Sequence, residues 1–316
     1  MVKRFFDFEL PVIESLLKKY REHVLFIMKH FCWLITKNVG FKNLTLKTKQ
    51  GIFIVSTKDN AIGRSLYTKG QFEYDFSRKA VDLLRTHGYV KAENITLFDI
   101  GANIGIIGVG LLRSGMIAQA CAVEPEKYNY ELLRKNIKLN GLEAKILCLP
   151  FALGDSRTVL KMKISQTNLG DHRIQGATAL PDESASSASE VEIEHVESIP
   201  LDELIRLPEV AEKNWSVDNA ILWTDVQGYE GYVFKGARAF LSKGVPTVSE
   251  IWPEGIRSAG MSLEAFTAIV QSQWSDYWVL RGERFIRYPI VMFDRYLEEI
   301  EYGDGNVIFT PPPPIT

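Results

Sequence analysis

The sequence has few cysteines and no excess of charge of either sign. Its 316 residues include only 3 cysteines, Cys32, Cys121 and Cys148, an odd number without metal-ligand spacing. We therefore expect reduced core thiols, with no disulfide and no zinc site. Lys and Arg number 37 against 39 Asp and Glu. Because this balance provides no basic field for a phosphate backbone, we expect no nucleic-acid partner.

Long apolar runs are missing as well. The nearest approach, residues 24–28, ends at Lys29 and His30, well short of the roughly 20 apolar residues that span a bilayer. Residues 1–9 mix charged and aromatic side chains and do not resemble a secretory signal. The sequence therefore predicts a cytoplasmic chain.

What is present near the start is the pattern of an amphipathic helix. Charged residues such as Lys18, Arg21 and Glu22 lie off its apolar stripe. The stripe consists of Ile13, Leu16, Leu17, Tyr20, Val24, Ile27, Met28, Phe31 and Leu34. Two interpretations stay open: packing on the rest of the chain or on a second subunit, as a homo-oligomer, and peripheral attachment to a membrane surface, since the helix is basic and carries Phe31 and Trp33.

Two further elements are expected before residue 90. Residues 44–49 and 51–56 alternate around a turn at Gln50 and Gly51, which predicts a hairpin. A helix from about Asp75 to His87 is ended by Gly88. We assign residues 1–90 to this N-terminal part and residues 91–316 to the main domain.

The rest of the chain alternates strands with helices. A helix over residues 126–140 has Pro125 at its start and Gly141 past its end. Such alternation predicts an α/β fold with a doubly wound, Rossmann-like, seven-stranded sheet, whose ligand lies at the carboxyl ends of the strands. The expected strands are 95–100, 117–123, 145–149, 221–226, 247–252, 277–281 and 306–310.

The first of these strands runs into a glycine-rich turn and a helix, and the second ends on a carboxylate. Gly101 permits a sharp turn, and Glu124 can accept hydrogen bonds from both hydroxyls of a ribose. Asn103 occupies the place of the second glycine of a dinucleotide fingerprint, which argues against NAD or FAD. A cofactor with a ribose and no pyrophosphate fits best, and S-adenosylmethionine is the common one. The alternative is a glycine turn that binds nothing.

Four short motifs in this order resemble those of the FkbM family of S-adenosylmethionine-dependent methyltransferases. They are residues 99–105, 223–230, 235–237 and 246–250, and the resemblance extends from about residue 51 to residue 257. It implies a class I methyltransferase sheet and transfer of a methyl group to a hydroxyl of a sugar, glycolipid, polyketide or other small molecule. In such a reaction the cofactor S-adenosylmethionine is converted to S-adenosylhomocysteine.

Candidate cofactor residues lie at the strand ends and in the loop after the third strand, which is expected beside the adenine. The alternative is that the loop after the third strand is an ordinary loop without a ligand, because the two cases have the same sequence pattern. The assigned residues are Asp99, Gly101, Ala102, Asn103, Gly105, Glu124, Pro125, Phe151, Ala152 and Asp225.

An insertion over residues 156–200 is the expected lid and acceptor pocket. Residues 159–165 and 191–196 alternate as two strands, and the Ser/Ala run 184–189 predicts a flexible surface loop. Between them, residues 168–173 gather acid, imidazole and guanidinium in one turn. A plain surface turn is the alternative. The assigned acceptor residues are Asn168, Asp171, His172, Arg173, Gln227 and Glu250.

Methyl transfer to an alcohol requires alignment of the acceptor and removal of its proton. We predict His172 as the general base and Asp225 as the group that organises the centre, although an Asp before a helix can also be a cap. Asp225 and Glu250 could hold Mg²⁺ through waters, but we expect no metal. A catalytically silent nucleoside-binding or scaffold module and, less favoured, a nicotinamide oxidoreductase are the alternative functions.

Overall fold

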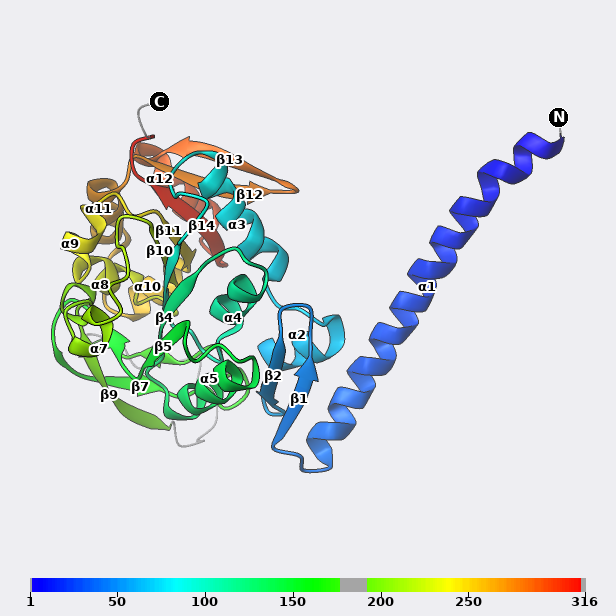
Figure 1. Ribbon diagram of the computed structural model, residues 1–316, viewed down its shortest axis with the longest axis horizontal. Helices are drawn as coiled ribbons and strands as arrows, with labels where there is room; N and C mark the ends of the chain where they lie inside the picture. Colours follow the sequence, from blue (N-terminus) through cyan, green and yellow to red (C-terminus); the bar gives the residue numbers. More distant parts are fainter. Residues whose placement is uncertain (1, 177–191, 314–316) are drawn as a thin grey trace.

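The computed structural model describes residues 2–176 and 192–313. Its centre is an eight-stranded sheet with the order β13-β12-β14-β11-β10-β3-β4-β5 (Figure 1). The strands are β3 (Thr96–Ile100), β4 (Gln119–Val123), β5 (Ile146–Leu149), β10 (Ala220–Thr224), β11 (Thr247–Ile251), β12 (Asp276–Arg281), β13 (Arg284–Pro289) and β14 (Gly305–Thr310). All seven expected strands are confirmed, and β13 is an eighth that the sequence pattern did not indicate.

Pairing within the sheet follows the doubly wound pattern. Strand β3 is parallel to both β4 and β10, and β14 is antiparallel to β11 and β12. Helices cover both faces, so the central strands β3 and β10 are buried along their whole length rather than at alternate residues. Leu97 packs on one side with Val81 and Leu84, while its neighbour Phe98 packs on the other against Phe240.

The helices on the two faces come from different parts of the chain. Helices α3 (Tyr74–Thr86), α4 (Ile106–Arg113) and α5 (Lys127–Leu139) supply the Leu97 side. The Phe98 side receives α6 (Leu201–Leu204), α7 (Pro208–Ala211), α8 (Glu230–Lys235), α9 (Arg238–Leu241), α10 (Pro253–Ser258), α11 (Leu263–Gln273), the 3-10 turn Ile290–Met292 and α12 (Phe293–Glu299). The predicted helices before His87 and after Pro125 correspond to α3 and α5.

The predicted hairpin is confirmed as β1 (Asn43–Lys47) and β2 (Ile52–Ser56), which pair antiparallel. It is fastened to α5 by two amide side chains. Asn136 exchanges hydrogen bonds with both backbone groups of Ile54, and Asn140 does the same with Ile52. Trp33 and Phe53 join Leu97 in one buried cluster, and the boundary between two domains near residue 90 stays a prediction.

The insertion forms a second, four-stranded sheet with the order β6-β9-β7-β8. Its strands are β6 (Ala152–Leu153), β7 (Thr158–Lys163), β8 (Arg173–Ile174) and β9 (Ile193–Ile199). Strands β7 and β9 pair antiparallel, as the alternation predicted. The Ser/Ala run 184–189 lies outside the described residues.

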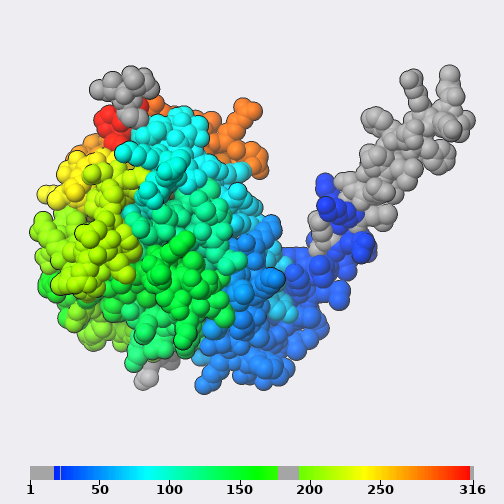
Figure 2. Space-filling model, viewed as in Figure 1, coloured from blue at the N-terminus to red at the C-terminus, as the bar shows by residue number. Residues whose placement is uncertain are grey.

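The predicted N-terminal helix is α1 (Val2–Asn38), which extends from the body as an arm and meets it near its C-terminal end (Figures 1 and 2). There it packs on α2 (Ile62–Lys69) through the fully buried Trp33, whose ring lies 5.5 Å from that of Tyr67. Within the described residues, no helix has the length and apolar character needed to cross a membrane.

Candidate functional site

A cleft opens where the winding of the sheet reverses direction. From β3 the chain steps outward through β4 to β5, then returns to the other side of β3 as β10. Doubly wound sheets bind ligands at this point. The wall of the cleft here includes Gly101, Glu124, Phe151 and Asp225.

The turn after β3 is held tightly against the neighbouring strands. Gly101 has a φ of +79°, and a Cβ at this position would lie 1.9 Å from the carbonyl oxygen of Asp225, so a side chain does not fit. The backbone N–H groups of Gly101 and Ala102 both donate to the carbonyl of Val123. These amides are therefore engaged within the sheet and are not free to hold a ligand.

Glu124 places a buried carboxylate in the wall of the cleft. Its Oε2 accepts from the N–H of Asn103 at 2.8 Å and its Oε1 from the N–H of Glu126 at 2.9 Å. Burial raises the pKa of Glu124 to about 8 despite these bonds. Each oxygen retains a lone pair for a hydroxyl donor, so the position suits a ribose.

Asn129 is a wall residue that sequence reasoning missed. Its side chain is fully buried, its Nδ2 donates to the carbonyl of Leu169 at 2.8 Å, and its Oδ1 has no partner among the described residues. A buried, unpartnered acceptor in a cleft wall is a site for a ligand donor. The only signal in the sequence is a polar residue in the first turn of the helix after Glu124.

The insertion loop covers one side of the cleft. The carbonyl of Leu169 accepts from Asn103 Nδ2 and from Asn129 Nδ2, which ties the loop to the glycine-rich turn and to α5. Leu169, Gly170 and His172 all line the cleft.

His172 lies in the wall as expected, but its bonding favours a role other than that of a base. Nδ1 accepts from the N–H of Ser165 at 3.0 Å, and Nε2, 3.9 Å from Glu126 Oε2, has no partner in the described part of the chain. Burial lowers the pKa of His172. The neutral ring therefore carries its proton on Nε2 and can donate it in a hydrogen bond. The general-base role stays a prediction.

Asp225 joins Glu250 through a bridging amide. Gln227 Nε2 donates to Asp225 Oδ1 at 2.6 Å and to Glu250 Oε2 at 2.8 Å. Burial, followed by the charge of Asp225, raises the pKa of Glu250 to about 10. Burial also raises the pKa of Asp225, while hydrogen bonds from Gln227 and Glu250 lower it. Glu250 therefore holds its proton more tightly than Asp225 does.

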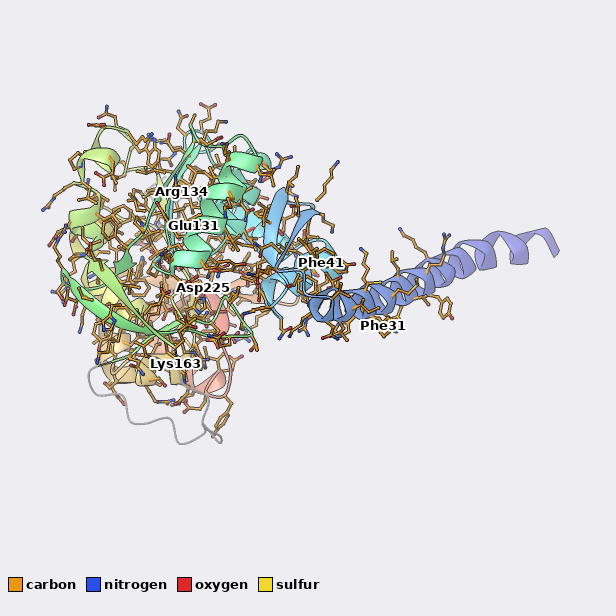
Figure 3. The ribbon with its side chains drawn as sticks, turned by 90° about the horizontal axis from the view of Figure 1, so that it is seen from below. Phe31, Phe41, Glu131, Arg134, Lys163 and Asp225 are labelled. Carbon is orange, nitrogen blue, oxygen red and sulfur yellow. The ribbon has the colours of Figure 1, made fainter. Side chains whose placement is uncertain are left out.

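Capping, the alternative role for Asp225, does not occur. Helix α8 begins at Glu230, and its N-cap Tyr229 makes no side-chain capping bond. Instead, Glu230 Oε1 accepts from the N–H groups of Val226 and Gly228. Asp225 lies in the interior of the fold (Figure 3) and lines the cleft.

Asp171 and Arg173 link the insertion to β11. The guanidinium of Arg173 donates twice to Asp171, at 2.5 and 2.8 Å. It also lies 4.2 Å from the ring centroid of Trp252, directly after the strand that carries Glu250. Among the described residues, Asp99, Ala102, Gly105, Asn168, Asp171, Arg173 and Glu250 do not line the cleft, whereas the other assigned residues do: Gly101, Asn103, Glu124, Pro125, Phe151, Ala152, His172, Asp225 and Gln227.

Asp99 and Asn168 lie outside the cleft wall. Asp99 is buried next to α4, where a Cβ on Gly108 would lie 3.3 Å from its Oδ2. Asn168 Oδ1 accepts from the N–H of Gly170 and shapes the loop. In residues 2–176 and 192–313, no group of three or more His, Cys, Asp or Glu side chains is arranged to hold a metal ion, and the expectation that no metal takes part stays a prediction.

Comparison with known proteins assigns the part of the chain that forms this cleft to a protein family. The methyltransferase FkbM domain matches residues 99–277, more than half of the chain. No curated protein matches the chain. A structure described as methyltransferase FkbM from Methylobacillus flagellatus KT shares 14% identity at a TM-score of 0.40, covering 79% of this chain and 55% of that one. This chain thus spans about half the length of that relative.

Two further structures show weaker likeness. Precorrin-6y C5,15-methyltransferase from Geobacter metallireducens GS-15 is 9% identical at a TM-score of 0.37, with 75% of this chain and 88% of that chain covered. Methanocaldococcus jannaschii Trm5 in complex with adenosine is 11% identical at a TM-score of 0.36, with 85% and 54% covered.

Proposed function

The chain belongs to the methyltransferase FkbM family, and we propose that it transfers a methyl group from S-adenosylmethionine to a hydroxyl of a small-molecule or glycan acceptor. The charge of the cleft wall supports S-adenosylmethionine rather than a nicotinamide cofactor. The described wall of the cleft contains two acidic side chains, Glu124 and Asp225, and no Lys or Arg. Such a wall favours a cationic sulfonium and disfavours the anionic pyrophosphate of a nicotinamide cofactor.

The residues present fit the adenosine part of this cofactor. Glu124 would accept from the ribose hydroxyls, because both of its oxygens are fixed by backbone donors and face the cleft. Asn129 Oδ1 and His172 Nε2 offer, in the same wall, one acceptor and one donor that have no partner among the described residues. Phe151 and Ala152 would lie beside the base.

The bound cofactor supplies a methyl group that its sulfonium already activates. The protein therefore has to orient the acceptor, exclude water and take up one proton. We assign the proton to Asp225. The hydrogen bond from Glu250 lowers the pKa of Asp225, while burial and the charge of Asp225 raise the pKa of Glu250 to about 10. Asp225 is therefore the member of the pair that ionises first and that would accept from the hydroxyl. In this scheme His172 donates a hydrogen bond and helps to position the ligands.

The first test is calorimetric titration with S-adenosylhomocysteine. We expect micromolar binding and no heat with NADH. Glu124→Gln keeps the shape but replaces one acceptor oxygen by an NH2 donor, so it can no longer accept from both ribose hydroxyls and both backbone N–H groups, and affinity should fall at least about tenfold.

Glu143→Gln, an exposed change on the loop after α5, is the matched control and should bind like the unchanged protein. Thermal melts of both variants exclude unfolding as the cause. Unaltered affinity in Glu124→Gln would show that the ribose does not meet this carboxylate, and the absence of any binding would favour the silent module.

A further inference from the structure

The arm formed by α1 carries an apolar stripe that is largely exposed in the described chain. At about 100° per residue, its members fall within an arc of about 120° on the helix. Ile27 is 54% and Phe31 64% exposed. Trp33, which packs on the body, lies on roughly the opposite side, while Ile27, Phe31 and Leu34 also border an open groove against α2. The stripe consists of Tyr20, Val24, Ile27, Met28, Phe31, Leu34 and Ile35.

Exposed apolar side chains continue past the end of the helix. Val39 and Phe41, in the turn that leads to β1, are 65% and 57% exposed. In Figure 3, Phe31 and Phe41 both lie on the arm side of the molecule, away from Asp225 in the interior. An apolar surface of this extent marks an interaction site.

The same segment is strongly cationic. Residues 18–58 hold nine of the 37 Lys and Arg of the chain but only one of its 39 Asp and Glu. Between His23 and Lys58 there is no acidic residue at all. Lys37, Lys42 and Lys47 are exposed. The net charge of −2 for the whole chain conceals this concentration.

Charge distinguishes between two occupants of the stripe. Tyr20, Val24, Ile27, Phe31 and Leu34 alternate spacings of four and three residues, which a coiled coil with a second copy would use. Self-association would however bring two cationic segments together, and from His23 to Lys58 neither copy offers a carboxylate to the lysines of the other. An anionic lipid surface complements both the apolar stripe and the charge.

We propose that α1 lies in the plane of an anionic membrane surface, with the stripe inserted among the lipids and the lysines of residues 18–58 at the headgroups. Most of the body then remains in water, because Trp33 joins it to the opposite side of the helix, and only the part of α2 that borders the groove beside Ile27 and Phe31 lies at the surface. This proposal is independent of the methyl-transfer chemistry.

The test is co-sedimentation of the full chain with lipid vesicles. We expect binding to phosphatidylcholine vesicles containing about 30% phosphatidylserine and weaker binding to phosphatidylcholine alone, with NaCl at about 0.5 M reducing the difference. The double variant Ile27→Glu/Phe31→Glu should lower the bound fraction at least about tenfold.

The matched control is Val159→Glu/Val291→Glu, which changes two residues on the body that are 59% and 70% exposed and should bind like the unchanged chain. Light scattering after gel filtration reports the oligomeric state. Failure of the chain to bind anionic vesicles overturns the proposal. This holds for a monomer and also for a dimer that the double variant Ile27→Glu/Phe31→Glu dissociates. So does vesicle binding that the stripe variant leaves intact.

Discussion

Asn103 shows how one residue changes the class of cofactor that a glycine-rich turn accepts. It has a φ of +50°, a left-handed conformation that Asn tolerates better than most residues. Its Oδ1 accepts from the N–H of Ile104 and its Nδ2 donates to the carbonyl of Leu169. The side chain that blocks close approach of a pyrophosphate therefore also holds the insertion loop over the cleft.

At the same scale, replacement of the two catalytic candidates separates their roles. Asp225→Asn preserves the shape and the Gln227 contact but cannot take a proton, so methyl transfer should slow by about 10² to 10⁴. His172→Gln retains a donor and should slow transfer less than about tenfold. The measurement is incorporation of labelled methyl from S-adenosylmethionine into a small-molecule extract, with S-adenosylhomocysteine affinity as control. A larger loss in His172→Gln than in Asp225→Asn would restore the histidine as base.

At the scale of elements, the hairpin owes its position to α5 rather than to a third strand. Asn136 is fully buried and binds Ile54 N–H at 2.7 Å, with further bonds to the carbonyls of Ile54 and Ile104. The amide thus pairs with the edge of β2 as a neighbouring strand would. This places β2 and the α2 segment that follows it beside the cleft, where Ile62 forms part of the wall.

Removal of this amide should loosen the hairpin. Asn136→Ala removes the partner of two half-buried backbone groups of Ile54 and of the buried carbonyl of Ile104, and we expect a loss of about 2 to 4 kcal/mol in the free energy of unfolding. Lys138→Ala, an exposed change on the same helix, should cost less than about 0.5 kcal/mol. Denaturant titration measures both, and hydrogen exchange at Ile54 should accelerate selectively. Equal stability of the two variants would mean that water replaces the amide.

The elements that the sequence predicted share a local signal, and those it missed lack one. Strands buried on both faces are apolar runs between turns, whereas β13 is mostly exposed and ends in Pro289, which reads as a loop. Gly101 and Glu124 belong to a contiguous motif and were assigned. The contact of Asn129 with Leu169, and the bond from Ser165 that fixes the His172 ring, arise from chain folding that no local pattern records.

For the whole molecule, acidic side chains are buried close to the functional edge of the sheet. Asp99, Glu124 and Glu230 are each at most 5% exposed, and none of them has a basic partner among the described residues. Burial raises the pKa of Asp99 and of Glu230 to about 7 and that of Glu124 to about 8. The fold thus retains protons there that exposed carboxyl groups lose near pH 4.

This difference predicts that stability falls as the pH rises from about 5 to about 8. In that window the unfolded chain has released protons that the folded chain still holds, so the free energy of unfolding decreases with pH. His172 opposes the trend, because its lowered pKa favours the fold as pH rises through about 6.5, but three carboxyl groups outweigh one imidazole. We expect a melting temperature at least about 5 °C lower at pH 8 than at pH 6. Glu230→Gln, which cannot ionise, should flatten the curve, while the exposed Glu143→Gln should not; a melting temperature that rises over this interval would mean that these carboxyl groups are ionised in the folded protein.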